Sequence, residues 1–533
     1  MTRGQPTFKA DVDALGILSQ VVGTLLAVEP TVTLPHGPGL DASQGYHFVH
    51  VGSGIELRFE GALRVRILSE VVPTAEQLRI LGDSGPGFRL IRGAAGSGKT
   101  TTALLRLKQL CRSRLARRAR LGHAEPVRVL VLTYNRTLEG YVAELARSQV
   151  EHGPGLLLEV STFGRWARGF LDQVDILDQR QIGAILRPLL DGIGVRQQRT
   201  EFFVDEVDYA LSRFLPADLA HYLTIRRDGR GTTPRVERAL RQRILDEVIP
   251  GYQAAKQARG VLDWNDVSLL ALEARGPTFD VVIVDEAQDF AANQVRALIA
   301  HLTEDHSTTF VLDAVQRIYP RFFAWSEVGI HLRPPEVYRL AKNYRNTAQI
   351  AAFARPLVAA LPSEDDGTLP DFSACQENGE IPKVVAGTYS RQIDYMLAMI
   401  LEDVDLTAES VAFLQPRGGA WFDYVREALH RRGVPFCELT RQSTWPTGPE
   451  AVAVCTIHSA KGLEFDHVML PGLNQQVTPH GSEEGDASLD QLRRLLAMGV
   501  GRARKTVTVG YKPGEQSTLI GLLDSSTYDL VRL

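Results

Sequence analysis

Short apolar runs alternate with longer stretches of helical spacing over most of the chain. The runs predict strands in two groups, at residues 88–92, 127–133, 156–160, 281–284 and 309–312, and at residues 384–386, 411–414, 452–456, 467–470 and 506–510. Strands that alternate with helices are typical of parallel sheets covered by helices on both faces. The pattern therefore predicts an α/β protein with two sheets rather than one.

Two regions depart from this alternation. Residues 164–261 are helical in pattern and rich in Arg, Leu and Asp, which predicts a helical subdomain inserted into the first α/β unit. The first seventy residues start with helical spacing and continue with alternating positions on either side of a Gly52-Ser53-Gly54 turn, which predicts a hairpin. We expect four units: an N-terminal extension at residues 1–70, a first α/β domain at 71–163 and 262–380, the helical insertion at 164–261, and a second α/β domain at 381–533.

The composition is that of an ordinary globular protein. Of the 533 residues, 44% are hydrophobic and 23% are charged, and no run of about 18 apolar residues indicates a membrane span. The first residues lack the layout of a signal peptide, so we expect a cytoplasmic protein without a membrane partner. The net charge of −4 gives no overall attraction to nucleic acid. The four cysteines are widely separated and predict reduced, structural thiols: Cys111, Cys375, Cys437 and Cys455.

Residues 93–100 read Gly-Ala-Ala-Gly-Ser-Gly-Lys-Thr, a phosphate-binding loop that follows a predicted strand and opens a predicted helix. Backbone N–H groups of such a loop surround phosphate oxygens, the lysine reaches the outer phosphates, and the hydroxyl after it ligates Mg²⁺. The loop therefore predicts that ATP and Mg²⁺ bind here. The candidate nucleotide-binding residues are Gly93, Gly96, Ser97, Gly98, Lys99, Thr100 and Thr101.

The predicted strand at 281–284 is followed by two acidic residues, Asp285 and Glu286. Carboxylates at the carboxyl end of a strand in an ATPase can hold Mg²⁺ and can orient or deprotonate the attacking water. We assign the metal-binding role to Asp285, together with Thr100. We assign the water-activating role to Glu286.

Two further signatures narrow the class of ATPase. The acidic pair continues as Asp285-Glu286-Ala287-Gln288-Asp289, and residues 458–465 read His-Ser-Ala-Lys-Gly-Leu-Glu-Phe. Together they resemble superfamily 1 helicases of the UvrD/Rep type, and the resemblance extends from about Pro73 to Pro513. It implies two RecA-like parallel-sheet domains with an inserted helical subdomain and a small N-terminal extension.

The resemblance also implies roles for individual residues around the nucleotide. Gln77 would read the adenine edge, Tyr344 would stack on the adenine, and Glu464 would bind the ribose. The γ-phosphate would be contacted or sensed by Arg345, Arg502 and Gln316. Arginine suits this role because its guanidinium is a fixed fork of donors for phosphate oxygens. Arg502 would come from the second domain, so the site would be complete only when both domains meet.

Aromatic and cationic residues between the ATP signatures predict a track for single-stranded nucleic acid, because bases stack on aromatic faces and phosphates pair with cations. The candidate contacts are Tyr134, Asn135, Phe163, Tyr319, Arg321, Phe322 and His458. Several positions depart from the family pattern. Arg321-Phe322 replaces a tryptophan followed by arginine, and the family's usual glycine, histidine and tyrosine are replaced by Leu312, Gly164 and Ala497. The ATPase prediction is unaffected, but the identity of the base-stacking rings stays open.

Two other segments are given structural interpretations. Asp263-Trp264-Asn265-Asp266 resembles a family segment for which we expect packing or helix capping rather than catalysis. The basic stretch from Arg106 to Arg120 lies on or just beyond the helix after the phosphate loop. We expect it to be a solvated helix face rather than a nucleic-acid groove.

These signatures predict an ATP-dependent translocase or helicase on single-stranded DNA, of 3′→5′ polarity by resemblance, in repair, recombination or defence. Relatives carry a large second insertion before the octet, for which the interval from Asn343 to His458 is too short, so autonomous unwinding stays open. Two alternatives remain. One is a nucleic-acid-responsive ATPase module that regulates a partner protein, and the other is an RNA helicase of the same superfamily.

Overall fold

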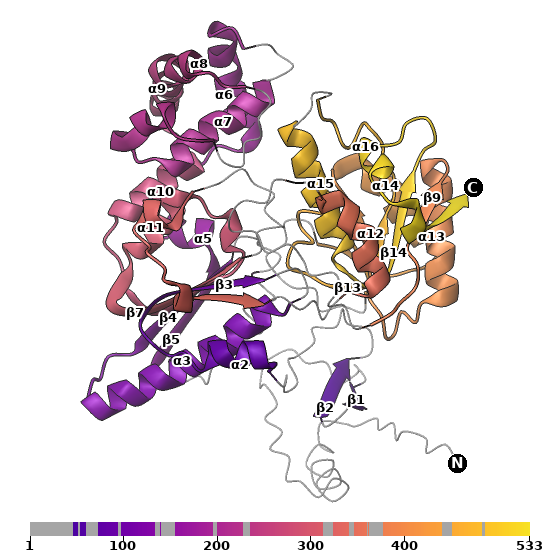
Figure 1. The fold of residues 1–533 in the computed structure, drawn as a ribbon, viewed down its shortest axis with the longest axis horizontal. Coiled ribbons are helices and arrows are strands. Elements are labelled where there is room, and N and C mark those ends of the chain that lie inside the picture. The colour runs from indigo at the N-terminus through magenta and orange to yellow at the C-terminus, as the bar shows by residue number, and fades with distance from the viewer. Residues whose placement is uncertain are drawn as a thin grey trace, which may run out of the picture.

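The computed structural model describes residues 46–51, 54–59, 73–93, 97–133, 139, 146, 155–195, 200–227, 235–312, 323–340, 346–359, 361, 377–439, 450–481 and 486–533. Within these residues the chain forms two parallel sheets covered by helices, and a separate group of helices above the first sheet (Figure 1). The predicted fold class is confirmed, because the two sheets form two α/β domains.

The first sheet contains six parallel strands in the order β5-β4-β6-β7-β3-β8. The strands are β3 (Gly87–Gly93), β4 (Val127–Thr133), β5 (Leu156–Thr162), β6 (Phe279–Val284), β7 (Leu302–Leu312) and β8 (Val337–Leu340). Alternate residues of β4 and β6 point to opposite faces and enter two different apolar clusters. One face packs on α3 (Lys99–Leu121), next to α2 (Ala75–Leu81), and the other on α5 (Phe163–Arg168), α10 (Trp264–Glu273) and α11 (Ala292–Ile299).

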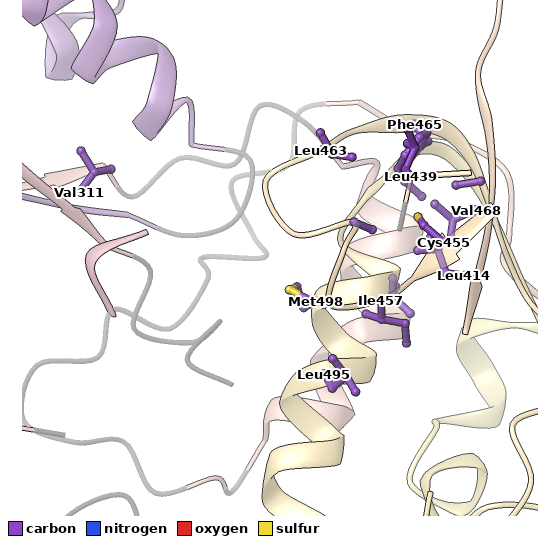
Figure 2. Packing of buried hydrophobic residues seen from close by; sticks show 14 of the residues in the cluster. Val311, Leu414, Leu439, Cys455, Ile457, Leu463, Phe465, Val468, Leu495 and Met498 are labelled. Atoms are coloured by element: carbon purple, nitrogen blue, oxygen red, sulfur yellow. The ribbon is translucent and has the colours of Figure 1, made fainter. Parts of the chain in front are cut away.

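The second sheet contains seven parallel strands in the order β11-β12-β10-β13-β14-β9-β15. The strands are β9 (Lys383–Ala386), β10 (Val411–Gln415), β11 (Phe436–Glu438), β12 (Val452–Thr456), β13 (Phe465–Leu470), β14 (Ala503–Tyr511) and β15 (Asp529–Arg532). One face packs on α13 (Tyr389–Asp403) and α14 (Asp423–Arg431), and the other on α12 (Ala348–Val358) and α15 (Ala487–Val500). Figure 2 shows this second core, where Leu414, Cys455 and Val468 lie near the α15 side chains Leu495 and Met498.

The helical insertion has an apolar core of its own. Its elements are α6 (Gln179–Gly192), α7 (Thr200–Arg213), a 3₁₀ segment (Pro216–Leu223), α8 (Arg238–Arg243), a π-helical turn (Ile244–Val248) and α9 (Ile249–Arg259). Leu186, Val207 and Tyr252 from three of these helices are buried together. At the base of the insertion, the backbone of Leu177 donates to the carbonyl oxygen of Leu262, which closes the subdomain where the chain leaves and re-enters the first domain.

Polar contacts fasten the insertion to the first domain. The buried Arg213 guanidinium at the end of α7 makes two hydrogen bonds to the Glu327 carboxylate, of 2.9 and 2.8 Å. The Asn293 amide of α11 donates to the carbonyl oxygens of Leu211 and Phe214, both at 2.9 Å. Because each bond joins a helix end of the insertion to the first domain, the two units are held in a fixed orientation at this contact.

The structure moves two of the predicted domain boundaries. The predicted insertion starts at residue 164 and so takes in most of helix α5, yet Trp166 of this helix is buried in the core beneath the first sheet, so the insertion begins near residue 176. Helix α12 was assigned to the first domain, yet Phe353 packs in the second core and against Tyr528. The second domain therefore begins before α12. Both errors arise because a helix between two domains gives no sequence signal of which core it joins.

The ten predicted strands are all present, with ends that extend by up to several residues. The short strands β8, β11 and β15 were not predicted, since runs of three or four residues at a sheet edge carry little periodic signal. The predicted hairpin is present as β1 (Tyr46–Val51) and β2 (Gly54–Phe59), paired antiparallel. The predicted helix before it lies outside the described residues. No helix in the described ranges is long and apolar enough to cross a membrane, and Cys111, Cys437 and Cys455 are free thiols.

Candidate active site between the two domains

The phosphate-binding loop joins the end of β3 to the start of α3. Gly93 has no room for a side chain, because a Cβ there would collide with the Ser97 hydroxyl and lie 3.0 Å from the Leu340 carbonyl oxygen. The Ser97 hydroxyl is buried and has no hydrogen-bond partner among the described residues. A buried hydroxyl of this kind fits a phosphate oxygen as its partner. Lys99, Thr100 and Thr101 form the first turn of α3, where helix N–H groups favour an anion.

Gly98 caps the N-terminus of α3 in the left-handed conformation, with φ of 74°, and a Cβ there would lie 3.0 Å from the Gln77 amide nitrogen. We expect Gly98→Ala to lower the free energy of unfolding by more than the about 1–2 kcal/mol that this conformation costs a residue with a Cβ, and to weaken ATP binding. Gly122→Ala is the matched control, because Gly122 ends the same helix with φ of 71° and open space around it. Chemical denaturation compares the two variants. Equal losses would contradict a specific contact with Gln77.

Gln77 lies directly over the phosphate-binding loop. Its amide oxygen accepts from the Thr74 N–H at 2.9 Å, which caps α2, and its amide nitrogen donates to the Thr102 hydroxyl at 3.0 Å. The side chain therefore links the start of α2 to the first turns of α3. The adenine contact expected from the resemblance stays a prediction.

The two candidate carboxylates follow the central strand β6. The Thr100 hydroxyl donates to Asp285 at 2.9 Å, which brings the two predicted Mg²⁺ ligands together. Burial and the neighbouring Glu286 carboxylate raise the pKa of Asp285 to about 7, despite the Thr100 hydrogen bond. Few positive charges offset the negative charge of the buried Asp285 carboxylate. A bound cation would supply the missing positive charge. The donor set of a hydroxyl and a carboxylate oxygen also fits Mg²⁺, which prefers oxygen ligands.

Glu286 has the only positive φ of any residue other than glycine in the described part of the chain, 55°. A left-handed backbone at a residue with a side chain costs free energy and is frequent at functional sites. Burial opposes ionisation of Glu286, but the charges of Lys461, Arg502 and Lys99 lower its pKa below the ordinary value. The carboxylate is therefore ionised at neutral pH, as a proton acceptor must be.

The second domain places a cation beside these carboxylates. Lys461, in the loop between β12 and β13, forms an ion pair with Asp289, and its Nζ lies 3.4 Å from a Glu286 oxygen. Lys461 and Asp289 are both buried. Charge from Asp289 and Glu286 raises the pKa of Lys461 against the effect of burial. Lys461 is not among the predicted site residues, although it stands within the octet at residues 458–465.

Arg502 lies between α15 and β14 and is almost fully buried. Its guanidinium donates to the carbonyl oxygens of Met498 and Leu463, both at 3.3 Å, and its charge lowers the pKa of Glu286. The Asn346 amide donates to the carbonyl oxygen of Gly501 at 3.3 Å and of Ala503 at 2.6 Å, which fixes the backbone on both sides of Arg502. The structure thus brings Lys99, Thr100, Asp285, Glu286 and Arg502 close together, and their roles in ATP hydrolysis stay predictions.

Two family models match the two sides of this site. The UvrD/REP helicase N-terminal domain matches residues 75–324, which include the phosphate-binding loop and both carboxylates. The UvrD-like helicase C-terminal domain matches residues 437–513, which include Lys461 and Arg502. The chain belongs to the UvrD/Rep-type superfamily 1 helicases. As a UvrD-type helicase it is an ATP-binding enzyme of the DNA helicase class.

Individual proteins similar to this chain include two helicases and one solved domain. The ATP-dependent DNA helicase UvrD2 of Mycobacterium tuberculosis H37Rv is 24% identical to this chain. The alignment is 556 positions long and covers 80% of this chain and 76% of UvrD2. The ATP-dependent DNA helicase Rep of Escherichia coli K12 is 37% identical over 59 residues, 11% of this chain and 9% of Rep. A solved C-terminal domain of a possible DNA helicase from Lactobacillus plantarum WCFS1 aligns with 35% of this chain and 98% of its own, with 23% identity and a TM-score of 0.26.

The other predicted helicase residues are placed as follows. Glu464, the predicted ribose contact, is exposed at the start of β13. His458 is half-buried, and burial together with the Lys461 charge lowers its pKa to about 4, so its imidazole is neutral at pH 7. Nine predicted site residues lie outside the described residues: Gly96, Tyr134, Asn135, Gln316, Tyr319, Arg321, Phe322, Tyr344 and Arg345.

Phe163 is not placed as a base-stacking residue. Its ring is 2% exposed and packs against Trp166 and Phe290, with centroid distances of 5.6 and 6.0 Å. The sequence could not distinguish this position from an exposed one, because an aromatic residue after a strand fits a core as well as a nucleic-acid surface. Phe163 is therefore a core residue in this structure.

The basic stretch along α3 of this helicase is largely occupied by internal contacts. Arg106 is fully buried and donates to the Ile80 carbonyl oxygen at 2.6 Å. Arg114 and Arg117 pair with Asp305, and Arg118 pairs with Asp280 at 2.7 Å. The expectation of a solvated face is therefore wrong for Arg106. The ion pairs and the burial both argue against a dedicated nucleic-acid groove here.

Proposed function

We propose that this helicase couples ATP hydrolysis, with Mg²⁺ at Thr100 and Asp285, to 3′→5′ movement along single-stranded DNA. The observation that supports this most directly is the approach of Lys461 from the second domain to Glu286 of the first. Hydrolysis changes the charge beside both side chains, so the nucleotide state would change how the two domains meet. The name of the UvrD2 relative supports DNA as the substrate, and the polarity rests on the family resemblance alone.

Each described residue has a distinct part in this proposal. Lys99 would hold the outer phosphates, and Glu286 would accept the proton of the attacking water. Bound Mg²⁺ would neutralise charge on the phosphates. Arg502 and Lys461 would bring positive charge from the second domain toward the same oxygens. Hydrolysis would then require both domains, which is the physical condition for coupling it to movement.

We expect single-stranded DNA to raise the ATPase rate of the full chain by at least about fivefold, because DNA that spans both domains would favour their closed arrangement. The rate is measured with single-stranded DNA, single-stranded RNA and a 3′-tailed duplex of the same sequence. RNA stimulation equal to that by DNA would favour the RNA helicase. A rate that no nucleic acid changes would contradict the proposal.

One observation favours the second candidate, an ATPase module that regulates a partner protein. The described residues 377–439 are accounted for by β9, α13, β10, α14 and β11 and their connections, so they contain no second helical insertion of the kind that relatives carry at this point. A motor without that subdomain would translocate but unwind poorly. Unwinding of a 3′-tailed duplex by the isolated chain, followed with a fluorescent strand, would overturn this candidate.

A further inference from the structure

Helix α2, which carries Gln77, is short and has few buried side chains. Leu78 is 56% exposed, and among the described side chains of this helix only Gln77 and Ile80 are buried. A helix of seven residues is too short to be stable by itself in water. The position of α2, and with it the position of Gln77, therefore depends on contacts with neighbouring elements.

Two fully buried residues of α3, Thr102 and Arg106, hold the two ends of α2. They are four residues apart, so they lie on the same face of α3. Near the start of α2, the Gln77 amide nitrogen donates to the Thr102 hydroxyl at 3.0 Å. Beyond its end, the Arg106 guanidinium donates to the carbonyl oxygen of Ile80 at 2.6 Å and to that of Asp83. A cation at this end of a helix also suits the helix dipole.

The contact at the end of α2 is itself fixed to the first sheet. The Asp83 carboxylate accepts from the Tyr338 hydroxyl of β8 at 2.6 Å and from the Arg89 guanidinium of β3. Arg106 also donates from its Nε to the Thr309 hydroxyl of β7 at 3.1 Å. Helix α2 is therefore held against both α3 and three strands of the sheet by polar contacts.

The Thr102 hydroxyl decides which way the Gln77 amide faces. It donates its single proton to the Gly98 carbonyl oxygen at 2.8 Å, so it can only accept from Gln77. The amide nitrogen must therefore face Thr102, while the amide oxygen accepts from the Thr74 N–H. Because an amide has two N–H donors and two lone pairs on its oxygen, one donor and one acceptor position are left for a ligand.

A donor beside an acceptor matches one edge of adenine, which presents the N7 acceptor and the N6 amino donor, whereas guanine presents two acceptors at the same edge. We propose that Thr102 is a positioning residue that makes the site selective for adenine over guanine nucleotides, with Arg106 holding α2 in place. The inference rests on the proposed function and on the expected contact of Gln77 with adenine, because it concerns how that nucleotide is chosen. It gives two residues outside the phosphate-binding loop a part in base recognition.

The test compares two substitutions of Thr102. Thr102→Val keeps the shape of the side chain and removes the hydroxyl, whereas Thr102→Ser keeps the hydroxyl. Binding of mant-ATP and mant-GTP, which carry the same fluorescent label on the ribose, is measured by titration of the full chain. We expect Thr102→Val to raise the Kd for mant-ATP relative to that for mant-GTP by about 5- to 100-fold, since a bidentate contact with a base gives about 1–3 kcal/mol of discrimination. Thr102→Ser should keep this ratio within about threefold of the unsubstituted protein.

Two further variants test the other parts of the proposal. Arg106→Lys keeps the charge, but one nitrogen replaces the guanidinium fork that contacts both α2 and β7. We expect it to change the ratio of the two Kd values in the same direction, by at least about threefold. Gln77→Ala removes the amide and should change the ratio at least as much as Thr102→Val.

Thr308→Val is the matched control. Thr308 is buried on β7, its hydroxyl lies 2.9 Å from the His306 Nδ1, and alternation along the strand points it away from the face that Thr309 presents to Arg106. This variant should lower the melting temperature and leave the ratio of the two Kd values unchanged. A ratio that changes equally in Thr308→Val and Thr102→Val would reduce the effect to a general loss of stability and overturn the proposal.

The remaining outcomes separate the inference from the proposed function. The inference is overturned if Thr102→Val or Gln77→Ala leaves the ratio unchanged, or if Thr102→Ser changes it as much as Thr102→Val. Binding requires no DNA, so a chain that selects mant-ATP but whose ATPase rate no nucleic acid changes contradicts the proposed function alone. A chain that binds neither nucleotide contradicts both.

Discussion

Replacing Glu286 with glutamine is expected to lower the DNA-stimulated ATP turnover by about 100- to 10,000-fold, the usual contribution of a general base. The carboxylate is ionised because Lys461, Arg502 and Lys99 lower its pKa, and an uncharged amide of the same shape cannot accept a proton. Phosphate release at saturating ATP and DNA measures the loss. Binding of ATP, measured separately, should persist, because glutamine keeps the volume of the side chain.

Glu304→Gln serves as the control for this variant. Glu304 is exposed on β7 of the same sheet, so its replacement should leave turnover within about twofold. Lys99→Ala should also abolish turnover, but through loss of the phosphate contact, so it should weaken ATP binding as well. Near-normal turnover in Glu286→Gln would exclude Glu286 as the base.

Replacing Lys461 with methionine is expected to lower the free energy of unfolding by about 3–5 kcal/mol, because the substitution leaves buried carboxylates without the ammonium group between them. Asp289 and Glu286 belong to the first domain and Lys461 to the second, so the loss also weakens the contact between domains. Urea denaturation followed by circular dichroism measures it. ATP turnover should fall in the same variant.

The matched control is Lys512→Met, which removes a lysine from a half-exposed pair with Glu515. Surface pairs of this kind contribute about 0–1 kcal/mol. The double variant Lys461→Met with Asp289→Asn should recover part of the lost stability, because it removes a carboxylate together with the cation. If Lys461→Met costs no more than Lys512→Met, the interdomain ion pair does not stabilise the contact.

The sequence predicted those parts of the molecule that depend on local pattern. Buried strands such as β6 are continuous apolar runs, and the phosphate-binding loop is defined by glycine positions that its backbone requires. The ATP site followed from these, because parallel strands bring their carboxyl ends to one edge. The pairing of Lys461 with Asp289 did not follow, since no local pattern tells which charge a lysine 172 residues away will meet.

The nucleic-acid surface was harder to predict for the same reason. Phe163 and Trp264 are both aromatic residues at the start of a helix, and only the packing of α5 and α10 decides that the first is buried and the second exposed. Periodicity cannot resolve this, because each ring stands alone at its position. Gly164 is a departure from the family pattern that is visible in the sequence. The physical reason for it appears only in the structure, where a Cβ at Gly164 would lie 3.0 Å from the indole of Trp264.

The attachment of the helical insertion has a mechanical consequence. Arg213 binds Glu327, which comes after β7 and after the segment 313–322 that contains the predicted γ-phosphate sensor Gln316. Helices α6 to α9 lie beyond α10 and α11, on the side away from α3 (Figure 1). The insertion is therefore held on both sides of that segment along the chain, through Asn293 before it and through Glu327 after it.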